Sequence, residues 1–373
     1  MDKNKQGENK NPPQVVISIL NWNGWQETLN CLQSVRQLRY PNYLVAVVDN
    51  GSRDESLLKL RAWAKDNYRD GEAFVEYSRE TAIAGGDTAG EANLEDGGPK
   101  RRMVLIENRE NLGFTTGNNV TIQYALRRSH AADYVLLLNN DTTIDEDCLT
   151  QLIAAGEKAQ AGVVGAIIKA RESGHVQFAG YEGSHPMLRC FFHPLLRLRP
   201  SAPNHPLGYR TSVWVSGAAM FIRREVLEEV RRATGCYLDD ALFIYGDEAD
   251  FCGRARKLGY ESVMAHHAFV YHGESTSMGG RFNPLAYYYG TRNRVRVARN
   301  LLPWPVRPLF HGYNIVQCAG RVAFNYLHGR RESARAILQG AFDGYTGVVG
   351  RWKYHDRAAP KPTASEAYLR TPA

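Results

Sequence analysis

Three polar residues, Asn139, Asn140 and Asp141, follow directly after an apolar run that starts at Tyr134. Such a run is typical of a buried strand in an α/β sheet, and these sheets bind ligands at the carboxyl ends of their strands. Carboxylate and amide oxygens suit hard cations such as Mg²⁺ or Mn²⁺. The pattern therefore predicts a cation site that holds a diphosphate. A simple turn is the alternative, because Asn and Asp favour turns.

A second polar group, Asp247, Glu248 and Asp250, falls at the start of a helix predicted over residues 247–258. Asp250 would lie one turn into that helix, within reach of Arg254. Asp247 would lie at the amino end and point away from the helix. A carboxylate placed in this way can take the proton of an attacking hydroxyl. Acidic residues also favour helix starts for electrostatic reasons alone, so a structural role is the alternative.

The elements that must position these groups begin near the amino terminus. Residues 15–20 form an apolar run broken by Asn21, and residues 28–38 have the apolar spacing of a helix. Residues 43–48 predict a second buried strand, which ends in Asp49. This order places Asp49 beside the loop that leaves the first strand.

A third segment, residues 108–119, carries Gly113, Gly117 and several amide side chains ahead of a helix that runs to Arg128. A loop of this kind can bring backbone N–H groups close to a phosphate or a sugar. An ordinary glycine turn is the alternative. The phosphate-binding Walker pattern and the dinucleotide-binding fingerprint are both absent from the sequence.

Taken together, these segments resemble the inverting glycosyltransferases of family 2, which have the GT-A fold. The resemblance rests on VVDNGSRD, NLGFTTGNN and LLLNNDT, in that order. Further along, WVSGAAMFIRR, YLDDALFIYGDEADFCGRAR and AFVYH resemble the acceptor side of the family. The similarity runs from about residue 14 to about residue 301. It is closest to the rhamnosyltransferase-like and galactofuranosyltransferase-like members.

The resemblance implies that Asp141 and His272 bind a divalent cation, Mn²⁺ or Mg²⁺. Without it, a lone His after an apolar strand would more often be structural. Asp247 matches the catalytic base of the family, and Glu248 is the second choice. Asn139 stands where the family often carries Asp, which should weaken cation binding without abolishing it.

Asp49 matches the residue that accepts the imide N–H of a uracil or thymine base. Its alternative role is to cap the following turn. Trp214 would stack on a sugar face, or else lie in the core. The implied nucleotide-sugar site comprises Asn21, Asp49, Asn111, Gly113, Phe114, Asn118, Asn139 and Asn140, and the implied acceptor site comprises Trp214, Ser216 and Gly217.

The chain has 373 residues, enough to bury a large core. We predict an α/β protein of the GT-A type, with a mostly parallel central sheet flanked by helices over residues 14–300. Residues 1–13 are polar and predict a disordered amino terminus, and residues 78–102 predict a disordered insertion. Residues 301–373 predict a helical, basic and aromatic extension with a loose tail.

Arginine and aromatic residues alternate beyond residue 280. No apolar run approaches the roughly 20 residues of a spanning helix, so we expect at most peripheral contact with an anionic membrane or a lipid-linked acceptor. A solvated basic face is the alternative. This basic and aromatic set comprises Arg281, Arg292, Arg294, Arg296, Arg299, Arg307, Tyr287, Tyr288, Tyr289, Trp304 and Phe310.

We therefore expect a metal-dependent inverting transferase for a hexose or deoxyhexose such as rhamnose. The donor would be a UDP- or dTDP-sugar, and the acceptor a saccharide or lipid-linked glycan in cell-surface polysaccharide synthesis. The six cysteines lack metal-binding spacing and no signal peptide precedes the first strand, which favours the cytoplasm, at the inner face of the cell membrane. The oligomeric state stays open, a homo-oligomer included.

Three other functions fit the sequence less well than glycosyl transfer. A sugar nucleotidyltransferase would carry Gly-x-Gly-Thr-Arg near the first strand, which is missing. A non-catalytic saccharide-binding protein would have no need to keep Asp141, Asp247 and His272 together. The formal net charge of +7 could suit a nucleic acid, but the basic residues follow no nucleic-acid-binding motif. We therefore expect no nucleic-acid partner.

Overall fold

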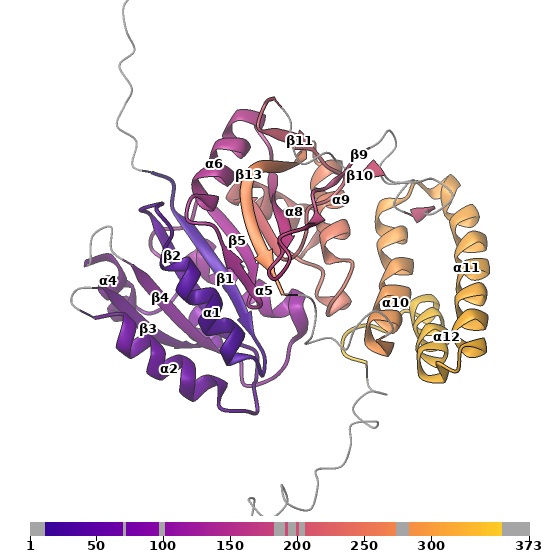
Figure 1. Cartoon of the computed structure of the whole chain (residues 1–373), viewed down its shortest axis with the longest axis horizontal. Helices are drawn as coiled ribbons and strands as arrows, with labels where there is room; N and C mark the ends of the chain where they lie inside the picture. Colours follow the sequence, from indigo (N-terminus) through magenta and orange to yellow (C-terminus); the bar gives the residue numbers. More distant parts are fainter. Residues whose placement is uncertain are drawn as a thin grey trace, which may run out of the picture.

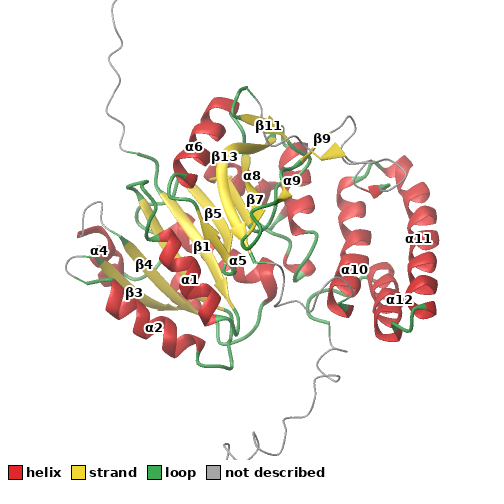
Figure 2. Cartoon of the chain, in the orientation of Figure 1, coloured by secondary structure: helices red, strands yellow, loops and turns green. Residues whose placement is uncertain are grey.

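The computed structural model describes residues 12–69, 72–96, 101–182, 191–192, 199–200, 206–273 and 283–352. In this part of the chain, a large central sheet carries helices on both faces, and a group of long helices packs beside it (Figures 1 and 2). The predicted α/β fold, with a central sheet flanked by helices and a helical carboxyl-terminal region, is confirmed.

The parallel half of the sheet contains the strands that end in polar residues. Strand β1 (Val15–Asn21) runs parallel to β2 (Tyr43–Asp49) on one side and to β5 (Tyr134–Asn139) on the other. Beyond β2, the sheet continues with β4 (Arg102–Glu107) and β3 (Ala73–Ser78), again in parallel. The carboxyl ends of β1, β2 and β5 therefore meet at one edge of the sheet.

The register of these strands brings the polar ends side by side. Asn21 pairs with Asp49 across β1 and β2, and Leu20 pairs with Asn139 across β1 and β5. Because the strands are buried on both faces, their apolar residues alternate between two cores. Along β1, for example, Ile17 belongs to one core and Val16 to the other.

The other half of the sheet is mixed. Strand β12 (Ala219–Arg223) is antiparallel to both β5 and β7 (Val163–Ala170), and β13 (Ser262–His272) is parallel to β7. The short strands are β6 (Thr142–Ile144), β8 (Val176–Phe178) and β11 (Tyr209–Thr211) in this sheet, and β9 (Tyr181–Glu182) with β10 (Arg199–Pro200) in a separate pair.

Amphipathic helices cover the two faces, and the core residues of each helix show which face it covers. One face is covered by α1 (Trp25–Val35), α2 (Ser56–Asn67) and α6 (Cys148–Ala159). The opposite face is covered by α5 (Gly113–Arg127), α8 (Arg224–Thr234) and α9 (Asp247–Lys257).

Residues 78–102, predicted as a disordered insertion, contain helices α3 (Arg79–Ala84) and α4 (Thr88–Asp96). The prediction of disorder is wrong for this part. The polar composition concealed a long-range anchor, because Glu91 of α4 is buried and accepts a hydrogen bond from Arg128 Nε at 3.0 Å. Two tyrosine hydroxyls, from β3 and α5, donate to the same carboxylate. Residues 97–100 lie outside the described part.

The carboxyl-terminal helices are α10 (Pro284–Leu301), α11 (Arg307–Leu327) and α12 (Arg331–Thr346), with short 3-10 segments at Asp240–Leu242 and Trp304–Val306. Helix α10 packs against both α12 and α9. It therefore joins the helical group, at the right of Figure 1, to the sheet. The helical region starts at Pro284, ahead of the boundary at residue 301 that we predicted from the sequence.

The predicted basic and aromatic set does not form one exposed surface, so this prediction is wrong. Tyr288, Tyr289, Arg292 and Phe310 are all buried. Arg292 donates to three backbone carbonyl oxygens, two of which precede α9. The alternation of arginine and tyrosine thus serves internal packing, because a guanidinium can satisfy several carbonyl groups at once. Arg281 lies outside the described residues.

Candidate active site

A pocket of about 330 Å³ opens where β1 and β5 end. Concave sites at this edge of an open α/β sheet are the usual position for ligands. The pocket brings together the predicted cation ligands, the predicted base and part of the predicted acceptor side. Its lining comprises Leu20, Phe114, Asn139, Asn140, Asp141, Ser216, Gly217, Ala218, Ile244, Tyr245, Asp247, Glu248 and His272.

Asp141 and His272 lie together at the ends of two strands. His272 ends β13, which pairs with β6, so that His272 stands opposite Thr142. The Nε2 atom of His272 lies 3.2 Å from Oδ1 of Asp141, and the two side chains are 17% and 20% exposed. One imidazole and one carboxylate suit a divalent cation that takes its other ligands from phosphate and water. Among the described residues, no group of three or more His, Cys, Asp or Glu side chains is arranged to hold a metal.

Arg171 supports the cation end of the pocket and was not predicted from the sequence. Its Nη2 donates to the backbone carbonyl of Asp141, and its Nη1 donates to Glu27 at 2.7 Å. The backbone at the end of β5 is thereby tied to α1. No sequence motif indicated this residue, because the contact spans 30 positions along the chain.

Asp247 carries a buried carboxylate oxygen that faces no protein donor. Its side chain is 4% exposed, and its Oδ2 accepts no hydrogen bond from the described residues. Burial, and then the charge of Glu248, raise the pKa of Asp247 well above the ordinary range of an aspartate. A buried carboxylate oxygen without a donor is costly to the fold. It is suited to accept a hydroxyl proton from a ligand in the pocket.

Glu248 is placed differently, although it lines the same pocket. Burial raises the pKa of Glu248, and backbone N–H groups, first its own and then those of Gly217 and Gly246, oppose that rise. A Cβ atom at Gly217 would come within 2.9 Å of Glu248 Oε1, so a larger residue there would displace the Glu248 carboxylate. Glu248 Oε1 thus lies against the acceptor side at Gly217, whereas Asp247 Oδ2 has no donor among the described residues, which makes Asp247 the better candidate for the base.

The loop before α9 has an unusual backbone. Phe243, Tyr245 and Gly246 have φ angles of 65°, 69° and 85°, in the left-handed region that side chains other than glycine rarely adopt. Asn293 Nδ2 of α10 lies 2.7 to 3.0 Å from three carbonyl oxygens of this loop and donates to them. The first backbone N–H groups of α5 donate to the carbonyl oxygen of Phe243. The loop that aims Asp247 is therefore clamped from two sides, and sequence reasoning missed both Tyr245 and Asn293.

The ends of β1 and β2 form a closed network. Asn21 Nδ2 donates to Asp49 Oδ1 at 2.9 Å, and the Ser52 N–H donates to Asp49 Oδ2 at 3.1 Å. The Thr28 hydroxyl donates to the side chain of Asn21 at 2.8 Å. Asn21 and Asp49 are buried and line neither pocket of this edge. The bond from Ser52 is the turn cap that we predicted as the alternative role of Asp49.

A second pocket, of about 190 Å³, adjoins the first and shares Leu20, Phe114 and Ile244 with it. It is largely apolar and is completed by Trp22, Asn50, Asn111, Gly113, Phe243, Leu285, Tyr289, Arg351 and Trp352. The predicted nucleotide-site residues Asn111, Gly113 and Phe114 thus line this second pocket.

Asn50 hydrogen-bonds to two residues that line the second pocket, although it was not among the predicted site residues. It donates to Asn111 Oδ1 at 3.3 Å and to the carbonyl of Gly113 at 3.1 Å, and it accepts from Asn108. Asn118 is buried behind the wall of this pocket, where it accepts a hydrogen bond from Ser18. The amide side chains of this region therefore stabilise the loops that form the pocket, in addition to lining it.

Trp214 lies outside the residues that line either pocket. Its ring packs on Tyr181, with ring centroids 4.9 Å apart, and against one of the two sheet cores. This is the core position that we predicted as the alternative to sugar stacking.

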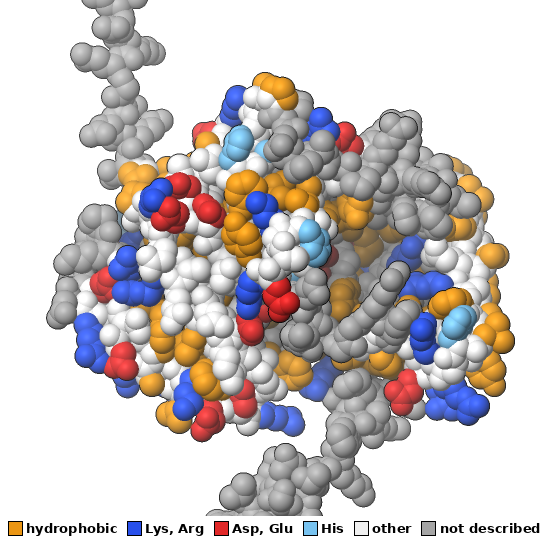
Figure 3. Space-filling view, in the orientation of Figure 1, with side chains coloured by type: hydrophobic (Ala, Val, Ile, Leu, Met, Phe, Trp, Pro, Cys, Tyr) orange, Lys and Arg blue, Asp and Glu red, His pale blue; other side chains and the backbone are white. Residues whose placement is uncertain are grey.

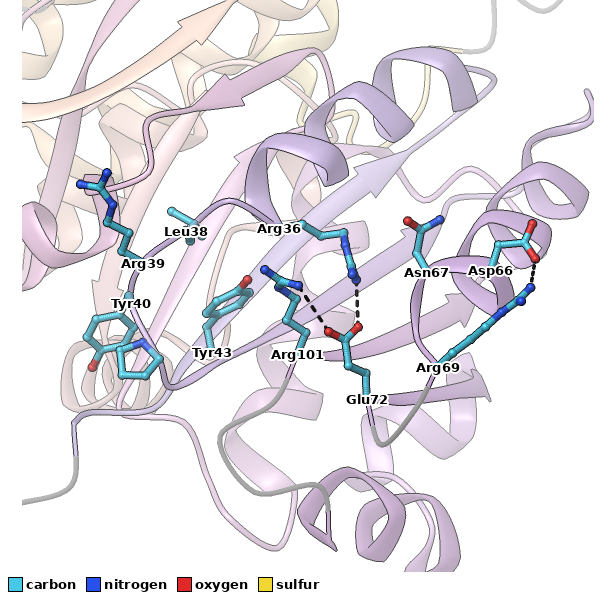
Figure 4. Close-up of a pocket in the computed structure, with 11 residues that line it drawn as sticks. Arg36, Leu38, Arg39, Tyr40, Tyr43, Asp66, Asn67, Arg69, Glu72 and Arg101 are labelled. Atoms are coloured by element: carbon cyan, nitrogen blue, oxygen red, sulfur yellow. Dashed lines mark hydrogen bonds and ion pairs between the residues drawn. The ribbon is translucent and has the colours of Figure 1, made fainter.

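A further pocket, of about 700 Å³, lies near the start of β2 and contains none of the predicted site residues (Figure 4). Its charges are paired with one another. Glu72 accepts from Arg36 at 3.1 Å and from Arg101 at 3.4 Å, and Asp66 accepts from Arg69. We therefore place the functional site at the opposite edge, where Asp247 has no donor.

Similarity to known proteins agrees with this location. The family described as "Glycosyl transferase family 2" matches residues 15–81, and the one described as "Glycosyltransferase like family 2" matches residues 87–287. These segments contain every residue of the first pocket.

Two curated relatives match parts of the chain. The low-salt glycan biosynthesis hexosyltransferase Agl10 of Haloferax volcanii is 27% identical over 152 residues, which are 41% of this chain and 46% of that protein. The uncharacterized protein y4gI of Sinorhizobium fredii is 25% identical over 203 residues, which are 50% of this chain and 20% of that protein. The match thus spans less than half the length of either relative.

Among solved structures, the mannosyltransferase PcManGT from Pyrobaculum calidifontis, in complex with GDP-Man and Mn²⁺, superposes with a TM-score of 0.51. The superposition covers 91% of each chain at 14% sequence identity, which shows a common fold. The two family matches together cover most of the described chain. The protein belongs to glycosyltransferase family 2.

Proposed function

We propose that the protein is an inverting glycosyltransferase in which Asp247 is the general base and Asp141 and His272 bind a divalent cation. The observation that carries the proposal is the pocket itself. It holds a buried carboxylate oxygen without a donor and an imidazole–carboxylate pair, joined by one cavity. Family membership supports glycosyl transfer as the reaction.

In the proposed reaction, the acceptor hydroxyl donates its proton to Asp247 Oδ2 while its oxygen attacks the anomeric carbon of the donor. A bond forms between that oxygen and the anomeric carbon, and the bond from the anomeric carbon to the diphosphate oxygen breaks on the opposite face. A cation held by Asp141 and His272 would offset the negative charge of the departing diphosphate. Direct displacement of this kind inverts the anomeric configuration.

The two adjoining pockets suggest how the donor lies. The sugar and diphosphate would occupy the first pocket, between Asp247 and Asp141, and the nucleoside would extend toward the apolar second pocket beside Trp22 and Asn111. We propose a UDP- or dTDP-sugar, dTDP-rhamnose included, as the donor. The capping network around Asp49 would then have to open for this residue to read the base.

For the acceptor, we propose a saccharide or a lipid-linked glycan in cell-surface polysaccharide synthesis. The name of the Haloferax relative, which refers to glycan biosynthesis, supports this class. The catalytic unit would comprise residues 14–300, and the enzyme would work at the cytoplasmic face of a membrane.

Calorimetric binding of UDP, dTDP, GDP and ADP, each with Mn²⁺ and with EDTA, tests the donor and cation assignment. We expect binding of a pyrimidine diphosphate that needs Mn²⁺ and is lost in Asp141→Ala. Asp145→Ala is the matched control, because Asp145 lies beyond the same strand and outside the pocket. Failure of all four nucleotides to bind, or equal binding with EDTA, would contradict the proposal. GDP is included because the similar mannosyltransferase structure contains GDP-Man.

A further inference from the structure

Helix α11 turns most of its large apolar side chains toward solvent, while Phe310 and two asparagines lie buried against the protein. Leu309, Val316 and Leu327 are 68%, 71% and 82% exposed, whereas Asn314 and Asn325 are each 1% exposed. A helix on the surface of a globular protein has the opposite polarity. The exposed side of α11 therefore suits an apolar environment better than water.

The apolar exposure continues along the whole helix. Six large side chains define what we call the α11 face: Leu309, Ile315, Val316, Phe324, Tyr326 and Leu327. The other exposed positions of α11 are proline, glycine and alanine, so this side of the helix carries no charge. In Figure 3, hydrophobic side chains form the right-hand rim of the molecule, where Figure 1 places α11. Large apolar side chains exposed together on one helix indicate an interaction surface.

The charges around this surface are mostly basic, with Glu332 at the start of α12 as the exposed exception. Between Glu274 and Glu332 the sequence contains no acidic residue. Arg307 and Arg321 lie on α11 itself, and Arg331 begins the next helix. Trp304, which is 77% exposed, stands just ahead of α11. An apolar face with a basic surround and an exposed Trp is suited to the boundary between anionic headgroups and acyl chains.

We propose that the α11 face docks on a lipid bilayer that contains anionic headgroups, with the helix lying in the plane of the membrane surface. The apolar side chains enter the boundary of the acyl region, and the arginines remain at the level of the phosphates. No described helix is both long enough and apolar enough to cross a bilayer. This proposal does not depend on the identity of the transferred sugar.

A second copy of the chain is the competing occupant of the α11 face. Two such faces brought together would place their basic surrounds against each other, and over residues 284–346 the one exposed acidic side chain is Glu332. Charge complementarity therefore favours an anionic bilayer.

Vesicle flotation with the full chain tests the proposal. One set of vesicles contains phosphatidylcholine alone, and the other also contains phosphatidylglycerol. We expect the protein to float with the anionic vesicles, less so at high salt. The triple variant Leu309→Gln, Val316→Gln, Leu327→Gln should bind at least about tenfold more weakly. Leu58→Gln on α2, also at an exposed leucine, should bind like the unchanged protein because α2 covers the central sheet and lies apart from α11 (Figure 1).

Analytical ultracentrifugation of the same proteins separates the two occupants. Because the substituted side chains are exposed, the triple variant should keep the circular dichroism and melting temperature of the parent. No binding to anionic vesicles, or binding that survives the triple substitution, would overturn the proposal. A dimer that the triple substitution dissociates, without vesicle binding by the parent, would assign the face to a second copy instead.

Discussion

Asp247 and Glu248 are adjacent in the sequence and line the same pocket, yet their carboxylates have different surroundings. The backbone N–H groups of Gly217 and Gly246 help to lower the pKa of Glu248, whereas for Asp247 only its own N–H does so, and its Oδ2 has no donor among the described residues. From the sequence we predicted both acids at the start of a helix, and we favoured Asp247 because it matches the catalytic base of family 2 glycosyltransferases. The sequence could not show which carboxylate would be engaged, because the donors of Glu248 include Gly217, which lies 31 positions earlier.

The pH dependence of transfer follows from the raised pKa of Asp247. A general base works in its deprotonated form, so activity should rise with pH through a pKa above the ordinary value for aspartate. The negative charge of Glu248 contributes to the raised pKa of Asp247. Glu248→Gln should therefore move the acidic limb of the kcat/KM profile to lower pH. An acidic limb of the kcat/KM profile that stays in place, or moves to higher pH, would contradict the effect of Glu248 on the pKa of Asp247.

At the scale of the element, the loop before α9 depends on a clamp from another helix. Asn293→Ala would remove the donor of three loop carbonyl groups, and we expect a loss of about 2–4 kcal/mol in the free energy of unfolding. Transfer should fall more than donor binding, because the loop aims Asp247. Asn300→Ala on the same helix is the control, since Asn300 makes no hydrogen bond to this loop. Urea unfolding and steady-state kinetics measure both effects, and an unchanged kcat would contradict the role of the clamp.

Helix α4 depends on the buried pair of Glu91 and Arg128. Arg128→Ala would leave the Glu91 carboxylate buried without its cation, and we expect a destabilisation of about 3–5 kcal/mol in urea unfolding. Arg127→Ala, at the exposed neighbouring position, should cost much less. Equal effects of the two substitutions would show that the pair does not anchor the insertion.

Elements differ in how far the sequence predicts them. The strands that end in Asn21, Asp49 and Asn139 were predictable, because a buried parallel strand and its polar exit are local patterns. Helices α3 and α4 were not, because they are held by a partner 37 positions away in the chain. The backbone of Phe243 and Tyr245 was not predictable either, since no local residue type requires a positive φ there.

At the scale of the whole molecule, the carboxyl-terminal helices contribute both to the site and to the surface. Helix α10 turns Arg292 and Asn293 toward the loop that carries the candidate base. Helix α11 presents an apolar face to the outside. The sequence predicted a helical, basic extension but assigned the buried arginines to an exposed surface. Arginine burial depends on carbonyl groups supplied by distant segments, which a linear pattern does not reveal.

The central claim is that Asp247 takes the proton of the acceptor hydroxyl. The most direct test compares sugar transfer and donor binding in the unchanged protein, in Asp247→Asn and in the control Asp66→Asn, whose side chain is exposed on α2. We predict that Asp247→Asn loses transfer by about 10²–10⁴-fold and binds the donor as before, while the control keeps both. Transfer by Asp247→Asn at a rate within a fewfold of the unchanged protein would contradict the claim.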